Sequence, residues 1–535
     1  MKTGRTRIGL AAAVVSAVAA LAPGDAPGAI ATNELHIAEA TGKAVKPLHG
    51  LGGGPKTGWG IGKDGGIYND ASPLYRKVAP PFVRLHDIET PFAREQFFDM
   101  HVYTNDTTAG HARYFDRSDA YIDAIVAVVP QAKIIFRLGE SIGAQDSINP
   151  YAVKPSDYDA WTAAAVDIAE HYVKKYPRVE WWFEIWNEAN LTGPEGSDCH
   201  KTFSSAPNSG DTCPAADYFA LYEKAALALG QLRKTGGYRN LKIGGPAESG
   251  IEKDDWSTFS CQEFLADLER YNAEHKCVVP LDFYSWHQYD GPTVVTPVAD
   301  EVRKLLAATK HYRKTLNICD EWNLTVDNSR VGKIGLAEGA ANTLATMISW
   351  QDSGLDGAVY YDAQLTGGFN GLWYKPYLDL MTGDQQSMME LMAAYAQGGI
   401  PAVTEVQRRI LEPYADTPNV PLGGYWAMRA FSAVAAHGRV LGIDRGSAVP
   451  STVYALASRD AAGGAIAIVN NSSSSAKIRV GAIPFPAPVT MCRVKGSNTA
   501  GAAVTPVAST LSGDSVDLTL DPYEIVLIGT GGGMQ

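Results

Sequence analysis

Short apolar segments that end in polar or charged residues recur along residues 49–361, and helical patterns separate them. Acidic and Ser/Asp residues at 156–159, for example, precede apolar residues that recur at helical spacing through 163–172. Strands that alternate with helices indicate βαβ units and a parallel sheet. Eight such strands predict a (β/α)₈ barrel with long loops. We expect the strands at 49–53, 82–86, 134–138, 182–188, 241–245, 283–287, 316–321 and 357–361.

Residues 438–535 have a different sequence pattern, in which short β-prone runs are separated by Gly, Pro, Asn and Ser. This pattern is typical of a β-sandwich. We therefore predict a barrel domain over 31–437 and an accessory C-terminal β-sandwich over 438–535. The early segment 33–45 is expected to add a strand to the sandwich.

The first 30 residues read as a secretory signal. Lys2, Arg5 and Arg7 precede the apolar run 8–21, and a small-residue segment follows at 22–29. A membrane anchor is the alternative, but a spanning helix needs about 20 apolar residues. The sequence therefore predicts a secreted or periplasmic protein with no membrane association after cleavage.

Composition and net charge limit the kinds of molecule that the protein is expected to bind. The chain has 535 residues, of which 45% are hydrophobic and 19% charged, as in an enzyme-sized globular protein. Its formal net charge is −12, and no block of basic residues provides the electrostatic footprint of a nucleic-acid binder. A neutral substrate suits this charge better.

Four of the six cysteines form two short-range pairs, Cys199 with Cys213 and Cys261 with Cys277. Each pair brackets polar or charged sequence, so in an exported protein we expect two disulfides that staple loops. Zinc is the competing interpretation, but neither pair has the Cys spacing of a structural zinc site. Cys319 lies inside a predicted strand and is expected to be an inert core thiol.

Two glutamates follow apolar strands at positions where barrel proteins keep their chemistry. Residues 181–186 lead directly into Asn187 and Glu188, and residues 316–319 lead into Asp320 and Glu321. Glu188 and Glu321 would end the fourth and seventh strands, which face each other across a barrel mouth. Paired carboxyl groups about 5 to 5.5 Å apart suit the retaining cleavage of a glycosidic bond.

Neighbouring residues leave alternatives open. Asp320 competes with Glu321 as nucleophile, whereas strand parity places Glu184 inside the barrel as a buried hydrogen-bonded group. Several tryptophans are candidate sugar platforms, although a tryptophan in a barrel is at least as often part of the core. These are Trp59, Trp286, Trp322 and Trp373.

The segment 183–191, Phe-Glu-Ile-Trp-Asn-Glu-Ala-Asn-Leu, resembles the acid/base motif of glycoside hydrolase family 39, the β-xylosidase and α-L-iduronidase family. Other segments resemble further family motifs in the same order, namely 83–87, 282–289, 319–323 and Asp362 with 367–372. The resemblance covers roughly residues 45–440. It implies a retaining glycoside hydrolase on a (β/α)₈ barrel that needs no metal or cofactor.

Carried over by position, the resemblance implies that Glu188 is the general acid/base and Glu321 the nucleophile. Tyr289 would donate to the Glu321 carboxylate, and Arg84 would lie beneath both acids. Two alternatives remain. Arg84 would only pair with an acid inside the barrel, and His86 and His287 would be core histidines. The candidate substrate contacts are Asn187, His86, His287, Tyr289, Trp322, Asp362 and Trp373.

We expect exo action on terminal sugars, with a β-D-xyloside as the first substrate. An α-L-arabinoside presents the equivalent anomeric configuration and is the main rival. The sequence departs from the family's xylosidases at 364–368, where no acid stands between Asp362 and Phe369. A carbohydrate-binding protein on an inactive barrel is the alternative from another class, but both glutamates are present. Transglycosylation would use the same residues as hydrolysis.

Overall fold

The computed structural model describes residues 30–57, 69–85, 115–139, 154–155, 157–192, 203, 214–327, 329–363, 370–374, scattered positions between 386 and 409, and 418–531. The predicted signal up to residue 29, Trp59, His86, Cys199 and Cys213 lie outside these ranges.

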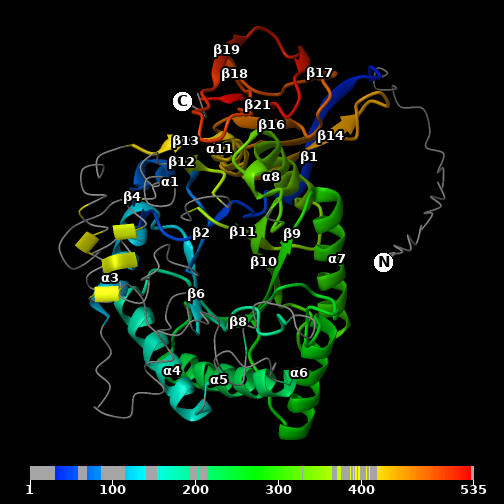
Figure 1. Ribbon diagram of the computed structural model, residues 1–535. Coiled ribbons are helices and arrows are strands. Elements are labelled where there is room, and N and C mark those ends of the chain that lie inside the picture. The colour runs from blue at the N-terminus through cyan, green and yellow to red at the C-terminus, as the bar shows by residue number, and fades with distance from the viewer. Residues whose placement is uncertain are drawn as a thin grey trace, which may run out of the picture.

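Eight parallel strands close into a barrel, which confirms the predicted fold class (Figure 1). Each observed strand coincides with one of the segments expected from the apolar pattern. In barrel order they are β2 (Gly50–Gly52), β5 (Phe82–Leu85), β6 (Lys133–Leu138), β7 (Trp181–Ile185), β8 (Leu241–Glu248), β9 (Phe283–Tyr289), β10 (Leu316–Asn323) and β11 (Gly357–Tyr360).

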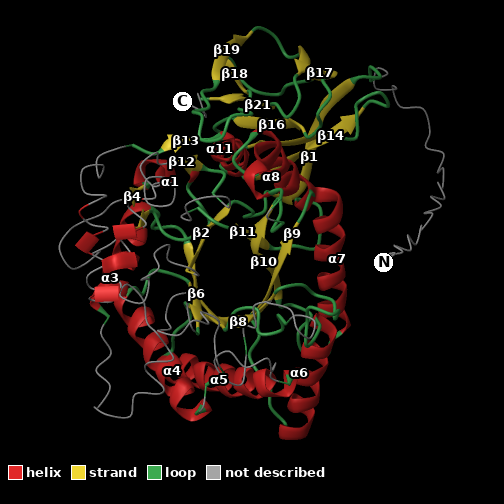
Figure 2. Ribbon diagram, viewed as in Figure 1, coloured by secondary structure: helices red, strands yellow, loops and turns green. Residues whose placement is uncertain are grey.

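Helices surround the strands, as Figure 2 shows. Local sequence explains where several begin: Asp157 accepts hydrogen bonds from two backbone N–H groups of α4, and Ser260 and Glu263 form a capping box on α6. The helices are α1 (Ser72–Val78), α3 (Asp116–Val128), α4 (Tyr158–Lys175), α5 (Ala215–Gly236), α6 (Cys261–His275), α7 (Pro292–Ala308), α8 (Ala337–Trp350) and α11 (Gly423–Ala435), with a 3₁₀ turn η2 (Val331–Lys333).

The two faces of the barrel strands bury different side chains. An apolar layer fills the interior and is formed by Phe82, Ile135, Trp182, Phe283, Ile318 and Val359. Residues of opposite parity, such as Phe183 and Tyr284, belong to the larger core that includes the outer helices. Because side chains alternate along a strand, the residues two positions after the interior layer also point inward. On β5, β7, β9 and β10 these residues are polar: Arg84, Glu184, Ser285 and Asp320.

A β-bulge in β10 interrupts this alternation at Asp320. Cys319 is opposite Trp286 and Glu321 is opposite His287, so Asp320 is an extra residue in the pairing of β10 with β9. A β-bulge re-aims the side chains that follow it. The consecutive acids Asp320 and Glu321 therefore both reach the barrel interior, as their shared contacts with Arg84 show.

The C-terminal strands form one nine-stranded sheet that curls on itself, because residues from both of its ends share one core. The sheet includes the segment predicted at 33–45, which lies between β14 and β17. In spatial order the strands are β19 (Val507–Leu511), β18 (Val489–Val494), β21 (Ile525–Thr530), β16 (Gly464–Asn470), β15 (Val453–Arg459), β14 (Arg439–Arg445), β1 (Glu34–Ala44), β17 (Ala476–Gly481) and β20 (Val516–Leu520).

Helices α8 and α11 lie between the barrel and this sheet and contact β15 and β16 (Figure 1). Two short ribbons complete the described structure. One pairs β3 (Lys56–Thr57) with β4 (Asn69–Asp70), and the other pairs β12 (Trp373–Tyr374) with β13 (Val420–Pro421). Across the ranges given above, no helix combines the length and apolar character that crossing a membrane requires.

The predicted disulfide between Cys261 and Cys277 is wrong. Cys261 is the first residue of α6, and Cys277 follows the C-cap residue Lys276. A helix of 15 residues is about 22 Å long, far beyond the Cα separation that a disulfide spans. Both thiols are free. Cys319 is also free and fully buried, and burial raises the pKa of its thiol, as expected of an inert core cysteine.

Candidate active site

Arg84 is the hub of a buried polar cluster inside the barrel. Its guanidinium donates to Glu184 Oε2 from Nε at 2.9 Å and from Nη2 at 2.7 Å, and to Glu321 Oε2 from Nη1 at 3.0 Å. It also donates to Asn187 Oδ1 at 2.7 Å and lies 3.2 Å from Asp320 Oδ2. One cation from β5 thus holds side chains from β7 and β10, and from the loop after β7, in fixed positions.

Glu321 is held from two sides. The hydroxyl group of Tyr289, at the end of β9, donates to Oε1 of Glu321, while Arg84 donates to Oε2. Burial and the adjacent charge of Glu321 raise the pKa of Tyr289 well above its ordinary value, so the phenol stays a donor. Both donors stabilise an ionised carboxylate and fix its direction.

Glu188 and Glu321 face the same ring nitrogen of His287. Oε1 of Glu188 is 2.7 Å from Nδ1 of the imidazole, and the same Nδ1 is 3.6 Å from Oε2 of Glu321. The His287 side chain is fully buried, whereas 18% of the Glu188 side chain is exposed. Glu188 can therefore exchange a proton with a bound molecule while its inner oxygen stays against the ring.

The backbone after β7 is shaped to present this carboxyl group. Strand β7 ends at Ile185, and both Trp186 and Glu188 have left-handed backbone angles, with φ of 73° and 51°. Such angles are uncommon for bulky residues and persist where surrounding contacts impose them. Here the N–H group of Glu188 donates to the carbonyl of Ala247 at 2.8 Å, and Trp186 is buried against the outer helices.

Beneath these acids, Glu184 and Asp320 have opposite pKa shifts. Burial alone would raise the pKa of Glu184, but the positive charge of Arg84 and hydrogen bonds from Asp320, Ser285 and Arg84 lower it to about 2. Burial holds the pKa of Asp320 well above its usual range; Arg84 opposes this shift, and the negative charges of Glu184 and Glu321 add to it. Glu184 is therefore the main ion-pair partner of Arg84, and the surroundings of Asp320 favour its neutral form.

The spacing of the two outer glutamates limits the chemistry. One oxygen of Glu188 and one of Glu321 lie within 4.8 Å of each other, together with a ring nitrogen of His287. Within the described chain this is the one group whose ligand atoms converge closely enough for a metal ion. Arg84 already brings a positive charge to Glu321, which opposes a second cation there, so we assign no metal site.

Comparison with known proteins agrees with this geometry. Residues 93–320 match the sequence model of glycosyl hydrolases family 39. The matched segment covers less than half of the chain. It includes Glu188 and the fourth-strand motif and extends to Asp320.

Curated relatives match over a shorter stretch. The β-xylosidase of Geobacillus stearothermophilus is 32% identical over 138 residues, which is 25% of this chain and 21% of that protein. The β-xylosidase of Caldicellulosiruptor saccharolyticus is 30% identical over 138 residues, 25% of this chain and 22% of that protein. The matched region thus spans about a fifth of either relative.

A solved structure shares the fold over nearly the whole chain. The GH39 enzyme from Xanthomonas axonopodis pv. citri has a TM-score of 0.59 at 16% identity, covering 94% of this chain and 97% of that one. At this identity the likeness concerns the fold alone. The family match supports the motifs, and this structure supports the arrangement of barrel and sheet.

The remaining predicted contacts lie in different surroundings. Asp362 is fully buried just after β11, with its carboxyl group beside Gly52 of β2. Trp373 is 3% exposed and packs against Tyr75 of α1, with 5.5 Å between the ring centroids. His86 and residues 364–369, which include the start of the glycine-rich segment 367–372, lie outside the described residues.

Two tryptophans that we expected as sugar platforms are in the outer core instead. Trp322 is 1% exposed and packs edge-on against Trp350 of α8 and Tyr360 of β11. Trp286 is fully buried, and its Nε1–H donates to Asn317 Oδ1 at 2.7 Å. The bulge at Asp320 explains Trp322, since turning Glu321 inward turns the next residue outward. Neither tryptophan can stack on a substrate from this position.

Ser285 is a further site residue, in addition to those predicted from the sequence. Its hydroxyl group donates to Glu184 Oε1 at 2.7 Å and accepts from the N–H group of Ala247 at 3.0 Å. It thereby connects the buried ion pair to the backbone that holds Glu188. Its parity was a usable signal, because it stands two residues before His287 on one strand.

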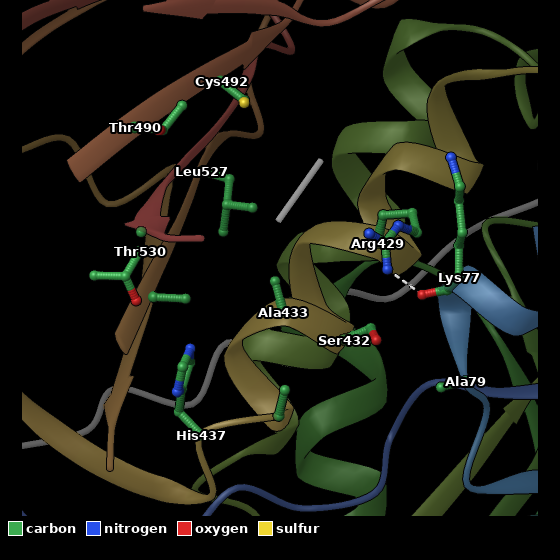
Figure 3. Close-up of a pocket in the computed structure, with 13 residues that line it drawn as sticks. Lys77, Ala79, Arg429, Ser432, Ala433, His437, Thr490, Cys492, Leu527 and Thr530 are labelled. Atoms are coloured by element: carbon green, nitrogen blue, oxygen red, sulfur yellow. Dashed lines mark hydrogen bonds between the residues drawn. The ribbon is translucent and has the colours of Figure 1, made fainter. Parts of the chain in front are cut away.

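A separate cavity of about 320 Å³ lies between α11 and the C-terminal sheet (Figure 3). Ala433 of α11 and His437, just after that helix, line one wall, and Cys492, Leu527 and Thr530 line the other. None of the predicted substrate contacts is among its lining residues. The carboxylate cluster is therefore the site that the family motifs and the barrel geometry share.

Proposed function

We propose that the protein is a retaining, exo-acting glycoside hydrolase in which Glu188 is the general acid/base and Glu321 the nucleophile. The observation that carries the proposal is the separation of the two carboxyl groups, whose facing oxygens lie within 4.8 Å. Retaining enzymes place their carboxyl groups about 5 to 5.5 Å apart, whereas inverting enzymes need about 6.5 to 9.5 Å to admit a water molecule.

In the first step a Glu321 oxygen attacks the anomeric carbon, and the bond from that carbon to the leaving oxygen breaks. The electron pair of the broken bond stays on the leaving oxygen, which takes the proton of Glu188. Tyr289 and Arg84 orient the attacking carboxylate. Exposure of part of Glu188 gives its outer oxygen access to the leaving group.

In the second step a water molecule attacks the same carbon from the side of Glu188. Glu188 accepts the water proton, and the bond between the sugar and Glu321 breaks, which restores the carboxylate. Two inversions give net retention. The same intermediate would transfer to a sugar hydroxyl if an acceptor replaced water.

The sugar would meet a small set of polar groups. The carbonyl end of the Asn187 side chain is held by Arg84, which leaves its NH₂ end to donate to a 2-hydroxyl. A contact to that hydroxyl that strengthens in the transition state contributes to catalysis. Asp362, Trp373 and His86 are proposed as further contacts to the sugar.

A β-D-xyloside is the proposed substrate, supported by the two relatives that are named β-xylosidases. An α-L-arabinoside presents the equivalent anomeric geometry to the same carboxylates and is the second candidate. Residues 1–30 support export as a secretory signal, so we propose a secreted or periplasmic enzyme.

A panel of nitrophenyl glycosides tests the proposal, with the mature protein and its Glu321→Gln variant as a matched inactive control. We expect cleavage of the β-D-xyloside, or of the α-L-arabinoside, and loss of that activity in the variant. NMR of the first product should show the anomeric configuration of the substrate. An inverted first product would remove the nucleophile role of Glu321.

A further inference from the structure

One tryptophan of the barrel is exposed near the proposed active site. Trp256 is 49% exposed, whereas the other tryptophans in the described ranges are buried or half-buried. It lies in the segment 249–260 between β8 and α6. Segments that follow the strands of a parallel barrel gather at the face that carries the chemistry. Because tryptophan offers a large contact area to a ligand, its exposure at this face calls for an explanation.

The main chain around Trp256 is held in place by hydrogen bonds. Its N–H group donates to Asp254 Oδ1 at 2.8 Å, and its carbonyl accepts from the N–H group of Thr192 at 2.8 Å. The next residue, Ser257, is 8% exposed and donates to the carbonyl of Glu252 at 3.0 Å. Among the described residues, no hydrogen bond or ring contact involves the indole itself. A fixed backbone therefore presents the indole to solvent.

The segment that carries Trp256 is bonded to the segment that carries Glu188. The N–H group of Thr258 donates to the carbonyl of Asn190 at 2.8 Å. The Asn190 side chain is fully buried, and its Oδ1 accepts from the N–H group of Ser249 at 3.0 Å. The segments after β7 and β8 thus form one connected wall beside the acid/base candidate.

These contacts limit the distance between Trp256 and Glu188. The N–H group of Leu191 donates to the carbonyl of Glu188 at 2.8 Å, which closes a turn, so their Cα atoms are less than about 7 Å apart. One further residue along the chain adds about 4 Å, and the antiparallel pairing of Thr192 with Trp256 adds about 5.5 Å. The Cα atoms of Trp256 and Glu188 are therefore at most about 16 Å apart. The two side chains with a short oligosaccharide between them can span this separation.

The proposed roles of the two glutamates determine which part of a substrate passes this wall. Glu321 attacks the anomeric carbon from one side, and the leaving oxygen departs from the other side with the proton of Glu188. The leaving group therefore extends away from β10 and along the segment that carries Glu188. Trp256 lies on the neighbouring segment, bonded to that one.

We propose that Trp256 forms a subsite for the leaving group and stacks on one face of a sugar ring there. The C–H groups on a sugar face are apolar and slightly positive, which suits the negative face of an indole. The inference rests on the proposed function, because Glu188 as the acid fixes the side on which the leaving group lies. It adds a preference for substrates whose leaving group is itself a sugar.

The test compares kcat and KM for two substrates in wild type, Trp256→Ala and Trp256→Phe. Xylobiose has a sugar as its leaving group, whereas the leaving group of β-D-xylosyl fluoride is a single atom that cannot reach Trp256. For Trp256→Ala we expect kcat/KM on xylobiose to fall about tenfold, because stacking on one sugar face removes on the order of 60 Å² of apolar surface from water. The loss should appear chiefly in KM, since the contact exists before the bond breaks.

Two comparisons separate stacking from a structural effect. Trp256→Ala should cleave the fluoride at the wild-type rate, because hydrolysis of the intermediate uses Glu188 as base and would slow if its segment were displaced. Trp256→Phe keeps an aromatic face and should stay within about threefold of wild type on both substrates. Val278→Ala is the matched control. Val278 is 52% exposed and precedes β9, at the opposite end of the barrel, so this variant should leave both substrates unaffected.

The results that would overturn the subsite are specific. Wild-type kinetics on xylobiose for Trp256→Ala, or equal losses on xylobiose and the fluoride, would show that Trp256 does not bind the leaving group. A loss for Trp256→Phe as large as that for Trp256→Ala would exclude stacking on an aromatic face. If wild type cleaved neither substrate, the proposed function would fail, and the subsite would fail with it.

Discussion

Nη1 of Arg84 donates to Oε2 of Glu321 at 3.0 Å, and both side chains are buried inside the barrel. The same guanidinium pairs with Glu184 and Asp320. A single cation from the second barrel strand therefore balances acids from the fourth and the seventh. Loss of this residue should affect both stability and catalysis.

Arg84→Leu should be strongly destabilising, because it leaves buried carboxylates without their counter-charge. Breaking a buried ion pair by removing one partner typically costs about 3 to 5 kcal/mol. Urea unfolding of the purified variant measures the change, and Arg76→Leu on the exposed face of α1 is the matched control. An unfolding free energy within about 1 kcal/mol of wild type would contradict the central position given to Arg84.

Tyr289→Phe should lower activity without unfolding the protein. The variant loses only the hydroxyl group that donates to Glu321, and a hydrogen bond to a charged group is worth about 1.5 to 3 kcal/mol. We therefore expect kcat/KM to fall by about 10- to 100-fold, and by the same factor on good and poor leaving groups.

Tyr284→Phe is the control for that measurement. Tyr284 is on the same strand, but its hydroxyl group points to the outer core, where it donates to Glu248. Its removal should alter stability more than the rate of bond cleavage. A loss for Tyr289→Phe confined to poor leaving groups would indicate that Tyr289 acts on the acid rather than on the nucleophile.

Glu248 should make the protein less stable as the pH rises. Burial raises the pKa of this fully buried carboxyl well above 4.5, and the Tyr284 hydrogen bond only partly opposes it. The native state therefore keeps a proton that the unfolded chain releases above about pH 4.5. The unfolding free energy attributable to Glu248 is complete below that pH and declines by up to about 1.4 kcal/mol per pH unit above it.

Urea unfolding of wild type and Glu248→Gln between pH 5 and pH 8 measures this effect. The stability of Glu248→Gln relative to wild type should rise steadily with pH, because a neutral amide has no proton to lose. Glu274→Gln, at an exposed position of α6, is the control and should run parallel to wild type. A parallel course for Glu248→Gln as well would show that Glu248 is ionised in the folded protein.

Much of the barrel could be predicted from the sequence, because strand ends in parallel barrels are marked by an abrupt change from apolar to charged residues. The change from apolar to charged residues predicted the surroundings of Glu184 and Glu188. Parity along β7 placed Glu184 in the interior, where it is fully buried against Arg84. The motif around Glu188 indicated where the strand would give way to the site.

The limits of prediction lie where the backbone departs from regular alternation. No residue type near Asp320 indicates a β-bulge. Regular alternation along the strand therefore could not predict that Asp320 and Glu321 both point inward, or that Trp322 points into the outer core. The cysteine spacing failed for a related reason. Sequence distance between Cys261 and Cys277 suggested a loop, whereas a regular helix keeps them apart.

Glu188 and Glu321 have different roles in the proposed mechanism, and azide rescue of their alanine variants distinguishes these roles. Glu188→Ala on a dinitrophenyl glycoside should form the intermediate on Glu321 and then stall, and azide, which needs no base, should release a glycosyl azide of retained configuration. Glu321→Ala should instead leave space for azide on the opposite face and give an azide of inverted configuration. Azide products with the opposite stereochemistry would reverse the two assignments, and unchanged hydrolysis in both variants would contradict the site itself.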